Sequence, residues 1–156
     1  MPVTIRPAGP ADINAIAAIE SAAFDRDRFA RRNLRRMLAG KSAVFMLAEA
    51  DGAALGYALL LFRRGARAAR LYSVATSPRA RGRGAGKALI EAADACAIRR
   101  GAQSLRLEVR ASNKAAIALY LRSGFAVLKE SPGYYDDGET ALKMEKRLMA
   151  AEVVRR

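Results

Sequence analysis

A short glycine- and arginine-rich segment, Arg81-Gly82-Arg83-Gly84-Ala85-Gly86, constrains this 156-residue chain more than any other feature. It follows an apolar run at residues 71–75 and precedes a helical pattern from residue 87 to about residue 98. Glycines at alternate positions let the backbone turn tightly and expose its N–H groups, and a helix N-terminus adds a dipole that favours anions. The flanking arginines suit a pyrophosphate. The segment therefore predicts a phosphate-binding loop, with a surface turn that holds no ligand as the alternative.

Two other phosphate-binding patterns do not fit the spacing. A Walker loop ends in Gly-Lys followed by Ser or Thr, whereas Gly86-Lys87 is followed by Ala88, which has no hydroxyl for magnesium. The dinucleotide fingerprint spaces its glycines differently from positions 82, 84 and 86. The sequence also contains no histidine, which removes His-based triads and His-containing metal sites. We therefore expect no metal.

A second segment carries a carboxylate and a phenol. Residues 105–109 alternate with the period of a strand, and a compact helix follows, with Ser112 or Asn113 as its N-cap. Glu108 thus lies on the strand, and Tyr120 lies two turns into the helix. Each residue has an ordinary alternative: Glu108 would be a solvent-facing strand residue, and Tyr120 a half-buried packing aromatic.

Together these segments resemble the GNAT superfamily of acyl-CoA-dependent N-acetyltransferases, whose Arg/Gln-x-x-Gly-x-Gly/Ala loop matches residues 81–86. Within the superfamily the chain is most similar to the bacterial ribosomal-protein-alanine N-acetyltransferase group. The matching segments are residues 107–113, 116–120, 124–125 and 134–139. That group usually has a tryptophan near the first basic helix, and this chain has none, which leaves the acceptor open.

The resemblance implies an α/β fold: a single GNAT-like domain over residues 1–149, with a mixed central β-sheet flanked by helices, and a frayed tail at 150–156. The hydrophobic pattern and turn signals agree with this fold. They predict a hairpin turn at Asp51-Gly52. They also predict strands near residues 3–6, 44–49, 55–62, 70–76, 105–109, 125–128 and 140–146, and helices near 11–23, 28–38 and 84–100.

The resemblance also implies acetyl-CoA as cosubstrate and gives roles to individual residues. Glu108 would take the proton from the amine, often through a water, and Tyr120, with a pKa near 10, would protonate the CoA sulfur. The backbone of one strand would pair with pantetheine, and the glycine loop would hold the pyrophosphate. These CoA contacts fall on Val74, Ala75, Thr76, Arg81, Gly82, Arg83, Gly84, Ala85, Gly86 and Lys87. The family places Asn113 against CoA as well, with capping of its own helix as the alternative.

The positive charge bears on the acceptor. Lys and Arg number 28 against 15 Asp and Glu, a net charge of +13, which is typical of proteins with nucleic-acid, membrane or acidic partners. The densest run of basic residues is either a solvated helix face or an electrostatic guide for an acidic peptide or a ribosomal surface. It comprises Arg26, Arg28, Arg31, Arg32, Arg35 and Arg36. Becoming neutral at pH 7 costs an α-amine roughly 1.4 kcal/mol and a lysine roughly 4.6 kcal/mol, which favours a protein N-terminus and keeps lysine as an alternative.

These arguments predict acetyl transfer to a protein or peptide, a ribosomal protein included. One alternative is an enzyme for a small amine such as a polyamine, drug or amino acid. The other is a non-catalytic binder of ribosome or nucleic acid, although the aromatic-interleaved motif of the usual RNA modules is missing; nucleic acid is not expected as a substrate. The lone Cys96 suits a reducing compartment. Because we find neither a signal peptide nor an apolar stretch of about 18 residues, we expect a cytoplasmic protein that does not use a membrane. We expect a monomer or a homodimer.

Overall fold

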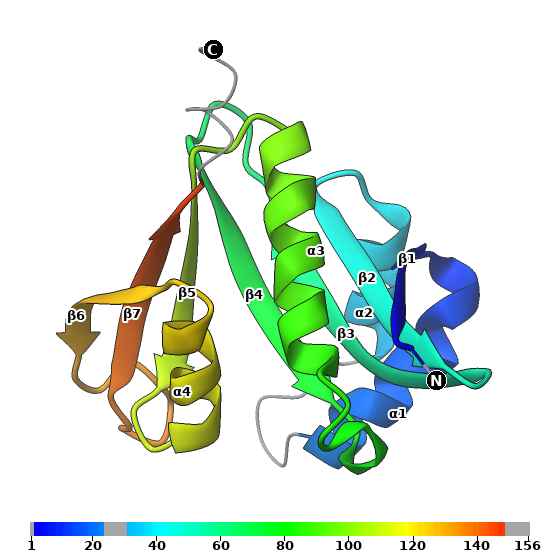
Figure 1. Cartoon of the computed structure of the whole chain (residues 1–156). Coiled ribbons are helices and arrows are strands. Elements are labelled where there is room, and N and C mark those ends of the chain that lie inside the picture. Colours follow the sequence, from blue (N-terminus) through cyan, green and yellow to red (C-terminus); the bar gives the residue numbers. More distant parts are fainter. Residues whose placement is uncertain (1, 24–30, 149–156) are drawn as a thin grey trace. The chain divides into compact units, whose positions relative to one another are not determined.

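The computed structural model describes residues 2–23 and 31–148. This part of the chain contains seven strands and four α-helices (Figure 1). In chain order they are β1 Thr4–Ala8, α1 Ile13–Ala23, α2 Arg31–Ala39, β2 Ala43–Ala50, β3 Ala53–Leu61, β4 Ala68–Thr76, α3 Ala85–Arg99, β5 Ser104–Arg110, α4 Lys114–Arg122, β6 Ala126–Ser131 and β7 Ala141–Arg147. Short 3-10 turns at Pro10–Asp12 and Pro78–Ala80 precede α1 and α3.

The strands hydrogen-bond in the order β1-β2-β3-β4-β5-β7-β6. The β4–β5 pair is parallel and joins Ala68–Arg70 with Ser104–Arg106, whereas β1–β2, β2–β3, β5–β7 and β6–β7 are antiparallel. The predicted mixed sheet flanked by helices is therefore confirmed. By its internal contacts the chain divides into two compact units, Met1–Arg63 with Leu71–Ala93, and Arg64–Arg70 with Asp94–Arg156. The single domain over residues 1–149 stays a prediction.

The first unit is built on the β2–β3 hairpin. Its turn has positive φ at both Asp51 (56°) and Gly52 (75°), the geometry that the Asp-Gly signal predicts. Because side chains alternate along a strand, one face of the hairpin packs against α1 and α2, and the other lies on the side of α3 (Figure 1). The core on the α1 and α2 side comprises Ile16, Ile19, Leu34, Leu38, Phe45, Leu47, Tyr57, Leu59 and Ala75.

This core contains a buried carboxylate that the sequence did not single out. Glu20 of α1 is only 2% exposed and accepts a hydrogen bond from the Tyr57 hydroxyl of β3. The same hydroxyl lies 3.1 Å from the Ser73 Oγ of β4. Burial, and then the neighbouring Glu20, raise the pKa of Tyr57 well above its usual range. A row of three polar groups thus crosses the apolar interior from α1 to β4.

The second unit is built on β5, which alternates between buried Leu105, Leu107 and Val109 and the more exposed residues between them. The chain leaves α4 through Gly124, whose φ is 99°. Phe125 was expected to begin the next strand, but β6 begins one residue later, and the Phe125 ring is buried. That ring packs edge-on against Tyr120 at 5.7 Å between ring centroids, so Phe125 belongs to the helix packing.

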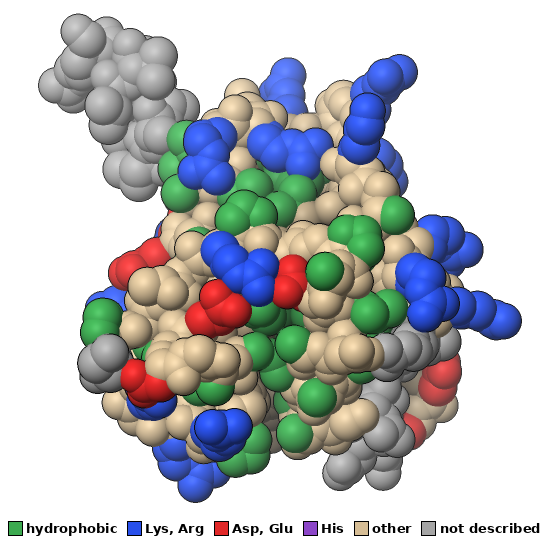
Figure 2. Space-filling model, turned by 90° about the vertical axis from the view of Figure 1, so that its right-hand side faces the viewer, with side chains coloured by type: hydrophobic (Ala, Val, Ile, Leu, Met, Phe, Trp, Pro, Cys, Tyr) green, Lys and Arg blue, Asp and Glu red, His purple; other side chains and the backbone are tan. Residues whose placement is uncertain are grey.

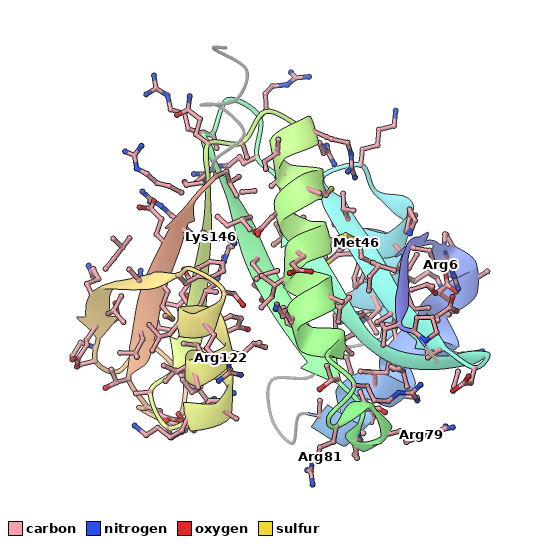
Figure 3. The ribbon with its side chains drawn as sticks, in the orientation of Figure 1. Arg6, Met46, Arg79, Arg81, Arg122 and Lys146 are labelled. Atoms are coloured by element: carbon pink, nitrogen blue, oxygen red, sulfur yellow. The ribbon has the colours of Figure 1, made fainter. Side chains whose placement is uncertain are left out.

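Polar contacts close the same unit. Lys146 of β7, labelled in Figure 3, forms an ion pair with Asp94 of α3. The aliphatic chain of Lys146 also packs against Gly124, where an added Cβ would lie 3.2 Å from the Lys146 Cε. The predicted core position of Cys96 is confirmed, because its side chain is 5% exposed. The outer strand β6 is irregular, since its register against β7 shifts between Val127 and Lys129.

The predicted basic helix is confirmed where it can be compared. α2 begins at Arg31, whereas Arg26, Arg28 and the rest of residues 24–30 lie outside the described residues. Figure 2 shows many Lys and Arg side chains, in blue, on the face that it draws. Within residues 2–23 and 31–148, no helix is long and apolar enough to cross a membrane, and no group of three metal-ligating side chains gathers.

Candidate active site

The glycine loop forms a tight turn into α3. Gly82 and Gly84 have φ values of 76° and 74°, which residues with a Cβ rarely adopt. The Ala88 N–H donates to the Gly84 carbonyl at 3.0 Å, so the N–H groups of residues 85–87 precede the helical ladder and point out of the helix start. Gly86 was expected to help the turn, but it lies inside α3. The turn therefore rests on two glycines, and the helix start has the donors that an anion needs.

The arginines of this loop differ in their surroundings. Figure 3 shows Arg79 and Arg81 reaching outward from the segment before α3. Arg83, in contrast, forms an ion pair at 3.2 Å with Asp51 of the β2–β3 turn. Both partners are substantially exposed, so this pair contributes little to stability. Arg81 is thus an exposed loop cation, whereas Arg83 is already paired with a carboxylate.

The strand before the loop is held very closely by β3. A Cβ at Gly56 of β3 would lie 2.6 Å from the Ala75 carbonyl oxygen and 3.1 Å from the Thr76 Cγ2. The Ser77 N–H also donates to the Leu55 carbonyl at 2.8 Å. The backbone of Val74, Ala75 and Thr76 is therefore fixed from the β3 side, by an approach that only glycine permits. Its pairing with pantetheine stays a prediction.

Glu108 pairs with one cation of the second unit and lies opposite a second one in the sheet. Arg70 of β4 donates from Nε to the Glu108 carboxylate at 2.9 Å, and its Nη2 lies 2.6 Å from the same oxygen. Lys143 of β7 is the register partner of Glu108, which places both side chains on one face of the sheet. The Glu108 side chain is 18% exposed. It is neither the solvent-facing residue of the ordinary alternative nor a free carboxylate, because Arg70 fixes its orientation.

Tyr120 lies on the buried side of α4 and is 8% exposed. Burial, with a smaller contribution from Tyr135, raises the pKa of Tyr120 to about 12. The sequence suggested an ordinary value near 10, so this phenol is a weaker acid than expected. It is fully protonated at neutral pH, however, and can therefore donate a proton or a hydrogen bond.

Two tyrosines connect the surroundings of Glu108 and Tyr120. Tyr134 accepts a long hydrogen bond of 3.5 Å from Arg70, and the Tyr134 and Tyr135 rings pack edge-on at 5.0 Å between centroids. Tyr135 is the residue that adds to the pKa shift of Tyr120. Within the described residues Glu108 and Tyr120 form no hydrogen bond with each other. The structure brings them into one unit, with Tyr134 beside Arg70 and Tyr135 contributing to the raised pKa of Tyr120.

Asn113 caps α4. Its Oδ1 accepts a hydrogen bond from the Ala116 N–H at 3.2 Å. This is helix capping, one of the two roles that the sequence suggests for Asn113. The turn before it is held by Glu139, which accepts from the Ser112 N–H at 3.0 Å and pairs with Arg110 at 2.8 Å. These bonds, with Ser112 first, lower the pKa of Glu139. Capping is therefore observed, and a contact of Asn113 with CoA stays a prediction.

The second unit can accept a proton on one group and donate a proton from another. A carboxylate is an acceptor-only group suited to hold an amine or a water, and a protonated phenol is a donor. Sequence reasoning missed Arg70, which pairs with the carboxylate, and Lys143, which lies opposite Glu108 in the sheet. Arg70 fell inside a predicted strand, but its partner is 38 residues away along the chain, and no local pattern pairs the two. The tyrosine pair was marked only through the family resemblance.

Comparison with known proteins identifies the fold family. Residues 13–125 match the Acetyltransferase (GNAT) family over more than half of the chain. The chain belongs to this family. The solved structure of the ribosomal-protein-S18-alanine N-acetyltransferase from Escherichia coli superimposes on this GNAT chain with a TM-score of 0.83 and 30% identity, covering 94% of each chain. The predicted family and its sheet architecture are thereby confirmed.

Sequence relatives agree with the family. An N-alpha-acetyltransferase of Sulfurisphaera tokodaii is 34% identical over 113 residues, which cover 65% of this GNAT chain and 68% of the relative. An uncharacterized protein of Mycobacterium leprae is 33% identical over 138 residues, which cover 86% of this chain and 37% of that protein. The chain thus spans well under half of the mycobacterial relative and about two thirds of the archaeal one.

Proposed function

We propose that this protein transfers an acetyl group from acetyl-CoA to a protein amine by direct attack on the thioester. Acetyltransferases of the GNAT family use acetyl-CoA, and the chain's membership supports the reaction type. The observation that carries the proposal is the pair of groups in the second unit, an oriented carboxylate at Glu108 and a protonated, buried phenol at Tyr120. One can accept a proton and the other can donate one, as aminolysis of a thioester requires.

Each residue has one task in this mechanism. Glu108, directly or through a water, takes a proton from the ammonium, and the neutral nitrogen then forms a bond to the thioester carbon. As the carbon–sulfur bond breaks, the nitrogen releases its second proton to solvent, and Tyr120 gives its proton to the sulfur and regains one from solvent. The N–H groups at the start of α3 and Arg81 bind the pyrophosphate, which suits the donors present there. The backbone of residues 74–76 orients the pantetheine arm.

The preferred acceptor is an N-terminal α-amine. An α-amine needs roughly 3 kcal/mol less than a lysine to lose its proton at pH 7, so one carboxylate base suffices for it. The names of two relatives, an N-alpha-acetyltransferase and a ribosomal-protein-alanine N-acetyltransferase, fit this preference. Arg32 and Arg35 are exposed on α2 and would attract an acidic peptide by long-range electrostatics.

A matched pair of variants tests the base. Glu108→Gln should lower turnover at pH 7 by about 10²–10⁴-fold while leaving the KM for acetyl-CoA unchanged. Glu145→Gln is the control, because Glu145 is also a part-exposed carboxylate that pairs with an arginine of β5, Arg106, at 2.8 Å. A similar loss in both variants, or near-normal turnover of Glu108→Gln, would contradict the assigned base.

A peptide panel tests the acceptor. Peptides with a free N-terminus, the same peptides with a blocked N-terminus and one lysine, and small polyamines are compared at equal concentration, and mass spectrometry locates the acetyl group. We expect the free N-terminus to be modified fastest. A polyamine that outperforms every peptide would support the small-amine alternative and overturn the protein acceptor, without touching the result for Glu108.

A further inference from the structure

Two groups of arginines in the second unit differ in their partners. Arg70, Arg106 and Arg110 each pair with a carboxylate and lie on the strands around Glu108. A second group is exposed and forms no ion pair with any residue in the described ranges 2–23 and 31–148. Its members, which we call the arginine end, are Arg64, Arg67, Arg99 and Arg147.

Backbone hydrogen bonds and chain position bring these residues to one end of the unit, and Arg64 lies three residues before Arg67 in the connection from β3 to β4. The Gln103 N–H donates to the Arg67 carbonyl at 2.7 Å, and the Gln103 carbonyl accepts from the Leu148 N–H at 3.0 Å. The backbones of Arg67 and Leu148 thus lie on the two sides of Gln103, about 10 Å apart by strand spacing, and Arg147 immediately precedes Leu148. Arg99 is the last residue of α3, just before the turn that leads to Gln103. This backbone separation is comparable with the Debye length of about 8–10 Å, so a partner that spans this end is attracted by several of the charges together.

The chemistry of this end favours a phosphate backbone. All four cations are arginines, whose guanidinium groups bind phosphate bidentately. The arginine end comprises three segments: the connection from β3 to β4, the end of α3 and the end of β7. None of the large hydrophobic side chains that are exposed in the described residues lies in these segments. Those side chains are Tyr72, Leu121, Val127, Leu128 and Tyr134. Neither a stacking platform for single-stranded bases nor an apolar anchor for a membrane is therefore present on these segments.

We propose that the arginine end is a docking surface for the phosphodiester backbone of duplex nucleic acid, separate from the acetyl-transfer residues. Glu108 is four residues further along β5 than Ser104, at which the strand begins beside this end. Binding is electrostatic and independent of base sequence, because phosphate contacts carry no sequence information. The docked nucleic acid holds the enzyme near protein substrates that share the same assembly and is not itself acetylated.

Salt dependence gives a quantitative test. Each neutralised phosphate contributes about 0.9 to the slope of log K against log salt. The variant Arg64→Gln/Arg67→Gln/Arg99→Gln should therefore make the slope of log K against log salt less negative by about 2.7 for a 20-base-pair duplex. Raising salt from 50 to 200 mM would then weaken the wild type by about 40-fold more than the variant. Fluorescence anisotropy with duplex RNA and duplex DNA in separate arms shows which duplex binds more tightly.

The control variant carries the same change of charge in the same unit. Lys114→Gln/Arg122→Gln/Lys129→Gln replaces three exposed cations that also form no ion pair with a described residue, and it should change the slope by less than 1. Excess CoA should not displace the duplex, and acetylation of a short peptide should be equal in the wild type and the arginine-end variant. Thermal denaturation verifies that both variants fold.

Four results would overturn the proposal. Equal loss of slope in both variants would mean that only the total charge matters. Displacement of the duplex by CoA would place binding at the glycine loop. Tighter binding of single strands than of either duplex would require a stacking surface elsewhere. Binding to vesicles of anionic lipid without binding to either duplex would assign the surface to a membrane. None of these readouts depends on turnover, so they are independent of the proposed acetyl transfer.

Discussion

Gly56 offers the sharpest test of how β4 is held in position. A Cβ at this site would lie 2.6 Å from the Ala75 carbonyl oxygen, about 0.8 Å closer than ordinary contact, which begins at 3.4 Å. The Leu89 Cδ1, at 3.2 Å from the same point, can rotate away, but a backbone oxygen cannot. The substitution Gly56→Ala must therefore push β3 and β4 apart near Ala75.

The size of the effect follows from the cost of overpacking. Forcing one extra methyl group into a packed site typically costs about 1–3 kcal/mol. In a chain of this length each kcal/mol lowers Tm by about 2–4 °C, so we expect Gly56→Ala to melt about 2–12 °C below the wild type. The control is Gly9→Ala, because Gly9 has an extended backbone and no atom within 4 Å of its Cβ position.

The assay combines thermal denaturation with steady-state kinetics. If the backbone of residues 74–76 binds pantetheine, Gly56→Ala should raise the KM for acetyl-CoA, while the KM for the peptide stays unchanged. Melting of Gly56→Ala within 1 °C of Gly9→Ala would refute the close approach. A destabilised variant with an unchanged KM for acetyl-CoA would instead remove this strand from the cofactor site.

Three further variants test the second unit. Arg70→Gln should lower kcat by up to about 10²-fold, because Glu108 loses the group that orients it; partial rescue by Arg70→Lys and normal turnover of Arg106→Gln would exclude a general loss of stability. Tyr120→Phe should flatten the pH dependence of the free energy of unfolding. The raised pKa of Tyr120 stabilises the fold fully below pH 10, and that contribution is lost as pH rises toward about 12. If the free energy of unfolding, measured with urea, changes equally between pH 9 and 11.5 in wild type and variant, this prediction is contradicted. Asn113→Ala should cost about 1 kcal/mol of stability with the KM for acetyl-CoA unchanged, and a raised KM would mean a contact with CoA.

Local signals predicted the elements well, because each signal depends on a few neighbouring residues. The Asp51-Gly52 turn follows from the positive φ that both positions adopt. The cap at Asn113 follows from its side-chain oxygen and the helical pattern after it. Phe125 was assigned to a strand because it begins an apolar run after Gly124, but β6 begins at Ala126 and the Phe125 ring packs against Tyr120.

Contacts between distant residues could not be predicted in this way. Glu20 and Tyr57 are 37 residues apart, and the periodicity of α1 identifies a buried face but does not say which polar group meets it. Likewise, the sequence marks Glu108 through the family pattern, whereas Arg70 reaches it only because β4 and β5 run parallel. The pKa shift of Tyr120 depends on its depth of burial, which the helical pattern alone does not give.

The two outer strands of the sheet, β1 and β6, have a consequence for self-association. An outer strand with an even row of free N–H groups is a template on which another chain can add a strand and grow a fibril. Pro7 in β1 has no N–H to offer, and the register shift next to Leu128 breaks the row in β6. We therefore expect concentrated protein to resist fibril growth, and a homodimer, where one forms, to associate through side-chain surfaces and not by extending the sheet.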